Sequence, residues 1–376
     1  MTKLAQAQHA RLPVRSRIYR ILYTAQGFCS RQELAARCGV SLPTLHQSLR
    51  ELMAEGLVRY TGEGPSTGGR RAQGLDIVPE LRYSVGIALN KRELRLVAAD
   101  LRLQELAYRS VRFDVGACLA GREPKLAAHL EAFLDGAGLD RSRLLGVSVT
   151  VPGLVSEDQK TLLVAPTLEM KNVPLSQLLG AIPYPVNVDN DGSASGYAEY
   201  FLRRMTGSMA YLSLENGVGG AIVLGGTPYF GDHRRSGEFG HICVEPGGLR
   251  CACGKYGCLE TYCTPQRIKA AFGVSTEEFF RGVEAHKPEY TALLYDMLRH
   301  LAVAINSIRM TLDCDVVIGG FMSEYLVPYL PILREYVLSG NPFEENADFV
   351  QFSSLRRHIT PLGAALHYIQ EFVAGV

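Results

Sequence analysis

The 376-residue sequence lacks most of the features that mark specialised classes of protein. It has no run of 18 apolar residues, so no stretch is long enough to cross a bilayer as a helix. The N-terminus lacks the apolar segment of a secretory signal peptide, and no low-complexity tract is present. The formal net charge is only +1. We therefore expect a cytoplasmic, globular protein with no membrane partner.

The charge is unevenly distributed along the chain. Residues 1–80 contain 11 Lys and Arg against 6 Asp and Glu, a net charge of about +5, which leaves about −4 for residues 81–376. A hydrophobic content of 47% and a charged content of 20% are ordinary for globular proteins, and the length allows two or three domains. A basic N-terminal part on a mildly acidic body suggests a polyanionic partner for the first part.

The first 80 residues have the pattern of a winged helix-turn-helix. Apolar residues repeat at helical spacing from Val14 to Thr24, and Ser30–Glu33 is a capping box for a second helix. A glycine turn leads to a third helix that Ser41 caps. Two short strands, at 56–60 and 74–78, would form the wing. The alternative is a three-helix bundle, or a helix-turn-helix that contacts protein. The basic excess favours double-stranded DNA.

Two groups of side chains are candidates for DNA contact. Polar residues of the third helix project away from its leucine stripe and are chemically suited to read base edges in the major groove: Thr44, His46, Gln47 and Arg50. The tip of the wing offers Arg70 and Arg71, which would contact phosphates or enter the minor groove.

Residues 81–376 read as an α/β domain that begins after Pro79 and Glu80. Three strand-like runs come first, and an apolar run at Leu144–Val151 reads as a buried strand. Another short strand runs straight into Asn190 and Asp191 and then into small residues at helical positions. A strand end that leads into a helix is a frequent place for a ligand site in this class of fold.

A short segment contains one His and three Cys in the order His-x9-Cys-x-Cys-x4-Cys: His241, Cys251, Cys253 and Cys258. Three thiolates and one imidazole form a complete tetrahedral set for Zn²⁺ and leave no position for a catalytic water. Gly254 and Gly257 supply the permissive backbone that such a loop needs. The alternatives are buried, unliganded side chains or a disulfide. We expect structural zinc.

These motifs together resemble the ROK family (repressors, open reading frames, kinases) and its winged-helix repressor branch. The resemblance rests on the following segments: Ser66–Arg71, Asn190-Asp191, Gly237–His241, Cys251–Glu260, Val316–Gly320 and Leu362–Ala365. It implies an N-terminal winged helix-turn-helix at 1–80 and a two-lobed, actin-like (ribonuclease H-like) sugar kinase-type domain at 81–376. The sugar cleft would lie near residue 190, and the zinc loop would span 241–258.

The resemblance also implies which residues bind sugar. Positions that hydrogen-bond sugar hydroxyls in family kinases are matched by Asn190, Asp191, Glu238, His241 and Glu260. His241 would bind zinc through one ring nitrogen and aim the other at a hydroxyl. The alternative role of Asn190 and Asp191 is to cap a helix, and that of Glu238 and Glu260 is to lie in solvent or beside the metal.

The sequence departs from the family kinases at the nucleotide site. Ala88 replaces the Asp of the first phosphate motif, and Glu215 places a carboxylate in the second phosphate loop. Phe321 follows the glycine turn, where its ring would crowd an adenosine. A carboxylate repels the polyphosphate that such a loop cradles. We therefore expect no enzyme activity, and Asp191 becomes a vestigial catalytic base.

The resulting hypothesis is a sugar-responsive transcriptional repressor of carbohydrate genes. It would bind a pseudo-palindromic operator as a homodimer, with a homotetramer as the alternative. The competing hypotheses are an active sugar kinase with an appended DNA-binding domain, and a repressor controlled by a protein partner. No Lys or Arg can be placed near the acidic sugar residues from the sequence, which favours a neutral sugar or amino sugar over a sugar phosphate.

Overall fold

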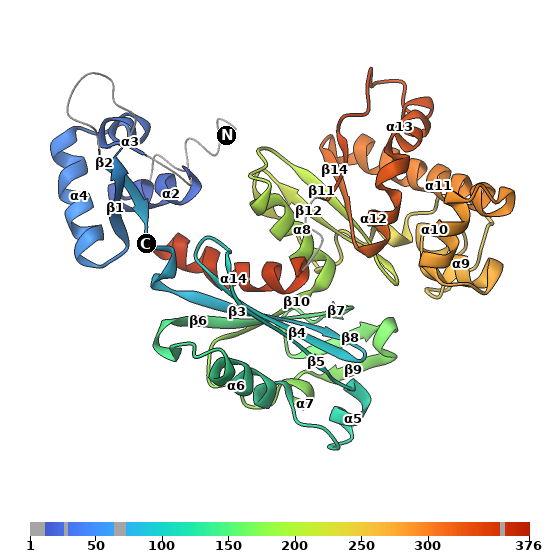
Figure 1. The fold of residues 1–376 in the computed structure, drawn as a ribbon, viewed down its shortest axis with the longest axis horizontal. Helices are drawn as coiled ribbons and strands as arrows, with labels where there is room; N and C mark the ends of the chain where they lie inside the picture. Colours follow the sequence, from blue (N-terminus) through green and yellow to red (C-terminus); the bar gives the residue numbers. More distant parts are fainter. Residues whose placement is uncertain (1–11, 26–28, 64–72, 354–357) are drawn as a thin grey trace.

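The computed structural model describes residues 12–25, 29–63, 73–353 and 358–376. The chain forms a small N-terminal unit and two larger lobes (Figure 1). Each of the two lobes is built around a five-stranded sheet. The C-terminal helix α14 (Ile359–Gly375) lies between the N-terminal unit and the first sheet (Figure 1). The expected N-terminal winged helix-turn-helix and two-lobed kinase-type body are both confirmed.

In its described residues, the N-terminal unit contains three helices and a two-stranded antiparallel sheet: α2 (Val14–Ala25), α3 (Arg31–Cys38), α4 (Leu42–Ala54), β1 (Val58–Glu63) and β2 (Gln73–Ile77). The expected caps are present, because Ser30 accepts from the Glu33 N–H and Ser41 accepts from the Thr44 N–H. Gly39 ends α3 at φ 63°, a left-handed conformation that costs glycine little. Local sequence therefore defines the helix-turn-helix.

The first lobe has the strand order β10-β6-β3-β4-β5, with these bounds: β3 (Tyr83–Asn90), β4 (Glu93–Asp100), β5 (Glu105–Arg112), β6 (Leu144–Val151) and β10 (Val186–Asn190). α6 (Leu126–Gly136) packs on one face of this sheet and α14 on the other (Figure 1). A further three-stranded sheet was not predicted: β7 (Leu154–Val155), β8 (Thr161–Ala165) and β9 (Met170–Pro174). Its strands are too short for a clear alternation of apolar residues.

The second lobe has the strand order β13-β12-β11-β14-β15: β11 (Met209–Leu214), β12 (Val218–Leu224), β13 (Thr227–Pro228), β14 (Asp315–Gly319) and β15 (Val350–Phe352). Its larger helices are α9 (Pro265–Phe272), α10 (Thr276–Glu284), α11 (Pro288–Leu312), α12 (Phe321–Leu326) and α13 (Leu330–Ser339). The sequence did not predict β15, α12 or α13. Across the described ranges, every helix is too short or too polar to span a membrane.

Helix α8 (Asp191–Leu202) starts at the end of β10 and packs tightly against α14. A Cβ atom at Gly363 of α14 would lie 2.0 Å from the Ala194 carbonyl oxygen of α8, so only glycine fits there. The contact with α14 thus explains Ala194, whereas a Cβ atom at Gly196 of α8 would lie 2.4 Å from the Ala221 side chain of β12. This helix pair, α8 and α14, has Asn190 and Asp191, two of the candidate sugar residues, at one end and approaches the N-terminal unit at the other.

The N-terminal unit is packed onto the body. One hydrophobic core includes Leu22 and Leu75 of the winged helix together with Val97 of β4 and Ile369 of α14. Arg102, in the turn after β4, is 8% exposed; it donates to the Leu22 carbonyl oxygen over 3.1 Å and to the Tyr23 carbonyl oxygen. It also forms an ion pair with Asp76 of β2. The two parts are therefore coupled by buried contacts.

Candidate functional site

The four expected metal ligands come together in the second lobe. One nitrogen of His241 and the sulfur atoms of Cys251, Cys253 and Cys258 all lie within 4.8 Å of one another. The Cys253 and Cys258 sulfurs are 3.7 Å apart, close to the ~3.8 Å edge of a tetrahedron built on ~2.3 Å metal–sulfur bonds. All nine cysteines are free, which removes the disulfide alternative. The donor set and its spacing suit a tetrahedral metal ion.

The loop needs its glycines where the sequence predicted. Gly257 has φ 78°, and a Cβ atom there would lie 1.8 Å from the Glu245 carbonyl oxygen. Burial raises the pKa of the Cys258 thiol to about 12, so the metal-free cluster favours a neutral thiol at this position. Metal binding would displace that proton, because thiolate is the ligand form.

Two carboxylates adjoin His241. Burial raises the pKa of Glu238, whose charge interacts with those of His241 and Glu260. Glu260 Oε2 accepts a hydrogen bond from the Val218 N–H over 3.0 Å, so one of its oxygens is already engaged. The Nδ1 atom of His241 faces Cys251 at 3.8 Å, which leaves Nε2 as the ring nitrogen for another partner. The structure thus brings three of the five predicted sugar residues together.

The other two lie where β10 becomes α8. Asn190 caps α8: its side-chain oxygen accepts from the Ser193 N–H over 3.1 Å, and its amide donates to the Gly153 carbonyl oxygen over 3.2 Å. The helix-cap role left open by the sequence is therefore present for Asn190. Asp191 accepts from the Gly192 N–H over 2.9 Å, and burial raises its pKa to about 6. Asp191 interacts electrostatically with Glu238, which links the two halves of the candidate sugar site.

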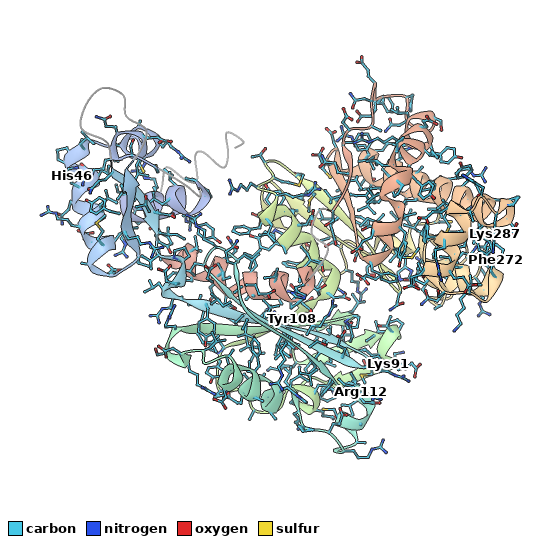
Figure 2. The ribbon with its side chains drawn as sticks, in the orientation of Figure 1. His46, Lys91, Tyr108, Arg112, Phe272 and Lys287 are labelled. Atoms are coloured by element: carbon cyan, nitrogen blue, oxygen red, sulfur yellow. The ribbon has the colours of Figure 1, made fainter. Side chains whose placement is uncertain are left out.

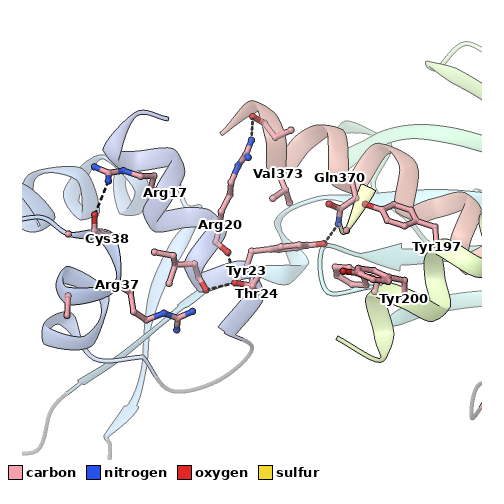
Figure 3. A pocket seen from close by; sticks show the side chains of 16 residues that line it. Arg17, Arg20, Tyr23, Thr24, Arg37, Cys38, Tyr197, Tyr200, Gln370 and Val373 are labelled. Carbon is pink, nitrogen blue, oxygen red and sulfur yellow. Dashed lines mark hydrogen bonds between the residues drawn. The ribbon is translucent and has the colours of Figure 1, made fainter. Parts of the chain in front are cut away.

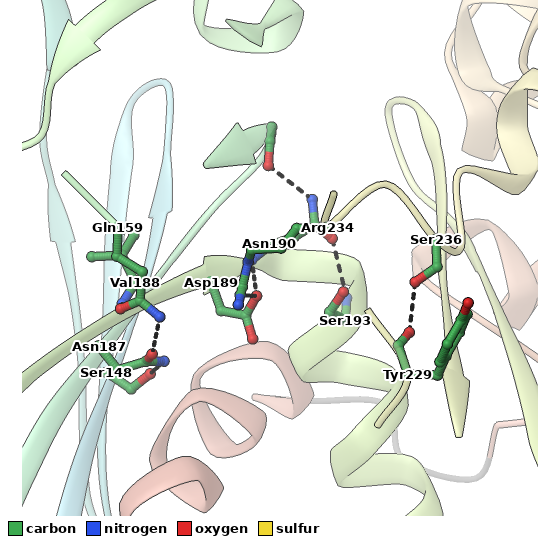
Figure 4. A network of polar contacts seen from close by, with 11 residues as sticks. Ser148, Gln159, Asn187, Val188, Asp189, Asn190, Ser193, Tyr229, Arg234 and Ser236 are labelled. Carbon is green, nitrogen blue, oxygen red and sulfur yellow. Dashed lines mark hydrogen bonds and ion pairs between the residues drawn. The ribbon is translucent and has the colours of Figure 1, made fainter. Parts of the chain in front are cut away.

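An arginine that sequence reasoning missed lies beside these residues. Arg234 forms an ion pair with Asp189 over 2.9 Å (Figure 4). Its guanidinium lies 4.7 Å from the Phe230 ring centre. Arg234 also helps to line a cavity shared by Asn190 and Glu238. It stands four residues before Glu238, and no local pattern predicts that it pairs with a strand end 45 positions away. The structure thus places an arginine beside the sugar residues, which the sequence alone did not allow, and this weakens the argument for a neutral sugar over a sugar phosphate.

The cavity at Asn190 and Glu238 measures about 20 Å³, room for about one water molecule. Behind it, hydrogen bonds hold the end of β10: Gln159 donates to Asn187 over 2.9 Å, and Asn187 donates to Ser148 over 2.9 Å (Figure 4). This cavity alone is too small for a sugar, and Asp191, His241 and Glu260 do not line it.

Two of the residues expected on the nucleotide side of the fold, Glu215 and Phe321, contact each other. Glu215 Oε1 accepts from the Phe321 N–H over 3.3 Å, at the start of α12. Burial raises the pKa of Glu215 to about 7, and the neighbouring Asp191 adds to the rise. Ala88 is buried in β3 opposite Arg95 of β4. A carboxylate thus engages a backbone N–H of the kind that would otherwise serve a phosphate.

The predicted base-reading residues all lie on one face of α4. Thr44, His46, Gln47 and Arg50 are exposed, whereas Leu45, Ser48 and Leu49 are buried. His46 lies at the outer edge of the molecule, away from the two lobes (Figure 2). Gln47 donates to Glu51 over 2.9 Å and accepts from Arg50 over 2.7 Å, which orders this face. Arg70 and Arg71 lie outside the described residues.

An exposed recognition helix on a winged helix, joined to a two-lobed sugar-kinase fold, defines a DNA-binding protein with a ligand-sensing body. The winged helix-turn-helix DNA-binding family matches residues 12–59. The ROK family matches residues 119–370. The chain belongs to the ROK family.

Relatives of the chain include repressors. A putative xylose repressor from Caldicellulosiruptor sp. (strain Rt8B.4) is 26% identical over 287 residues, which cover 74% of this chain and 72% of that protein. The DNA-binding transcriptional dual regulator NagC from Escherichia coli (strain K12) is 28% identical over 249 residues. That match covers 65% of this chain and 60% of NagC, so the chain aligns with about three fifths of the length of NagC.

Solved structures match over more of the chain. A ROK family transcriptional regulator described as a homologue of the E. coli MLC protein has a TM-score of 0.76 and 25% identity, over 96% of both chains. A ROK hexokinase from Thermus thermophilus has a TM-score of 0.62 and 26% identity, over 77% of this chain and 99% of the hexokinase. The hexokinase match covers less of this chain than the regulator match does.

Proposed function

We propose that this protein is a sugar-responsive transcriptional repressor in which residues 1–80 bind operator DNA and residues 81–376 sense a sugar. The observation that carries the proposal is a combination of two features. Helix α4 exposes a face of polar residues suited to read bases, and the body brings the acidic residues Asp191 and Glu238 close enough to interact. Xylose is named in the matched repressor described above, and N-acetylglucosamine is named in a further relative, an N-acetylglucosamine repressor of Escherichia coli that is 28% identical, so these are the first sugars to test.

The proposal includes no kinase activity. Glu215 engages the Phe321 N–H, and Ala88 offers no group to hold Mg²⁺. Without a bound nucleotide, Asp191 has no phosphoryl transfer to assist. An active kinase remains the alternative because ROK kinases share the fold. Addition of Mg²⁺ and ATP should not raise the melting temperature, and sugar-dependent ADP release should be absent.

We assign the four-residue cluster to structural Zn²⁺, held by His241, Cys251, Cys253 and Cys258. Three sulfurs and one nitrogen match the ligand preference of zinc. When bound, the ion would cross-link the loop and hold the His241 ring next to Glu238. The loop residues would then present a fixed set of donors and acceptors to sugar hydroxyls.

Sugar binding would act on DNA through the relative position of the lobes. The cavity of about 20 Å³ at Asn190 and Glu238 does not admit a sugar, so binding in that cavity requires a more open state. A ligand that binds only one of two conformations shifts the population toward it. Because the winged helix packs on α14 and on the first lobe, that shift would change the spacing of the two reading helices in a homodimer.

The test is thermal stabilisation of the metal-loaded protein by a panel of neutral sugars, amino sugars and sugar phosphates. An effector that binds at 100 times its dissociation constant contributes about 2.7 kcal/mol. Glu238→Ala should abolish the shift. Glu245→Ala, a change of the same type in the same loop, should retain it. Failure of every sugar to shift the wild type, with DNA binding intact, would favour control by a protein partner.

A further inference from the structure

A cavity of about 790 Å³ lies between the winged helix and the body. None of its described lining residues belongs to the sugar site, the metal cluster or the DNA-reading face described above. One wall comes from α2 and the end of α3, and the other comes from α8 and α14 (Figure 3). This volume falls within the range of ~300–1,000 Å³ typical of small-molecule sites. The cavity is therefore large enough for a metabolite.

The cavity is lined by positive charge and by aromatic rings. Its charged residues are Arg17, Arg20 and Arg37, with no Asp or Glu among the lining residues that the structure describes. Its rings belong to Tyr23, Tyr197, Tyr200 and Phe201. Guanidinium groups bind phosphate, sulfonate and carboxylate, and aromatic rings pack against an apolar body. The lining is complementary to an organic anion.

The three arginines use only some of their hydrogen-bond donors in contacts with described residues. Arg17 donates to the Cys38 carbonyl oxygen over 2.9 Å, and Arg20 donates to the Ala374 carbonyl oxygen over 3.2 Å. The Nε atoms of both are buried and make no hydrogen bond to any described residue. The Nη1 atom of Arg37 lies 3.8 Å from Oε1 of Glu33, which is too long for a hydrogen bond, and the Arg37 side chain is 42% exposed. The buried Nε atoms are out of reach of a ligand, so an acceptor in the cavity would bind the terminal guanidinium nitrogens of the half-buried Arg17 and Arg20 and of the exposed Arg37.

The position of the cavity gives a ligand access to both functional parts of the chain. Arg37 lies in the last turn of α3, and Gly39 caps that helix just before α4, the reading helix. Tyr197 and Tyr200 belong to α8, whose first residue is Asp191 of the candidate sugar site. A ligand held here would contact the sensor helix and the DNA-reading unit at once.

We propose that this cavity is a second regulatory site, separate from the sugar site, for a small anion carried on an apolar or aromatic body. The arginines bind the anionic group and the tyrosines bind the body. Because the two walls belong to different units, a ligand that spans them favours one orientation of the winged helix over others. The chain would then combine two chemical signals at one operator.

The experiment uses 8-anilinonaphthalene-1-sulfonate, a sulfonate on an aromatic body, as a fluorescent probe of the full-length, metal-loaded protein. The wild type should bind one probe per chain, and Arg37→Gln should weaken binding at least tenfold. Arg15→Gln is the matched control, because Arg15 lies on α2 outside the cavity lining and pairs with Glu55. Glu238→Ala should leave probe binding unchanged, so failure of the sugar proposal would not be confused with failure of this one.

The same titration is repeated with operator DNA present, where saturating probe should change the DNA dissociation constant of the wild type but not of Arg37→Gln. Equal probe affinity in the wild type and Arg37→Gln, or an equal loss in Arg15→Gln, would overturn the proposal. It would also be overturned if Arg37→Gln reduced DNA affinity and its salt dependence with no effect on the probe. That outcome would assign the arginine to DNA phosphates.

Discussion

Replacement of Arg102 by methionine should loosen the winged helix from the body. Methionine keeps an unbranched apolar side chain but lacks the guanidinium group, and with it the charge and the donors. The change removes the side-chain donor to the carbonyl oxygens of Leu22 and Tyr23 and leaves Asp76 without its ion-pair partner. These groups belong to α2 and β2, so the loss falls on the contact between the two units.

The magnitude follows from burial. Loss of one partner of a fully buried ion pair costs about 3–5 kcal/mol. Asp76 is 24% exposed and Arg102 is 8% exposed, so water partly solvates the remaining carboxylate and the lower end of that range applies. Arg102→Met should therefore lower the free energy of undocking by about 3 kcal/mol, equivalent to about a hundredfold change in the equilibrium.

Hydrogen exchange measures this undocking directly. Amides of α2 and β2 should exchange about a hundredfold faster in Arg102→Met, whereas amides of β11 and β14 in the second lobe should be unchanged. The matched control is Arg109→Met, in which an exposed arginine loses one bond to the Ala132 carbonyl oxygen. Exchange in α2 that is equally fast in both variants would refute the view that Arg102 docks the winged helix.

Three further predictions concern the metal, the pH dependence and DNA. Purified protein should contain about one zinc per chain by elemental analysis. Cys258→Ser should lose the zinc, whereas Cys243→Ser, a change outside the ligand cluster, should keep it. Equal metal content in the two variants would exclude the proposed site. Because the pKa of Asp191 is raised to about 6 from 3.8, the folded state binds this proton more tightly than the unfolded state, and stability falls as the pH rises through that window. Asp191→Asn should therefore stabilise the protein at pH 7.5 but not at pH 4, by denaturation midpoints, and a pH-independent difference would contradict this assignment. Gln47→Ala should cost about 1–3 kcal/mol at one operator base pair in competition binding, and an equal loss on all sequences would make Gln47 a backbone contact.

Local sequence determined the helix-turn-helix, the metal cluster and the strand-to-helix junction at Asn190. Each depends on residues within a few positions of one another, such as the capping pair Ser30 and Glu33 or the three cysteines of one loop. Hydrogen bonds and ligand sets of short span leave clear spacing patterns. The family motifs extended this reading to the two-lobed fold, which the structure confirms.

Only the tertiary structure decided the contacts between distant segments. Arg234 reaches Asp189 across 45 positions, and Arg102 joins a turn of the body to α2 and β2. Short strands such as β15 form because neighbouring strands supply their hydrogen bonds, so their own sequence carries little signal. Charge pairing and interdomain packing depend on where the chain places its segments in space, and residue spacing does not record that placement.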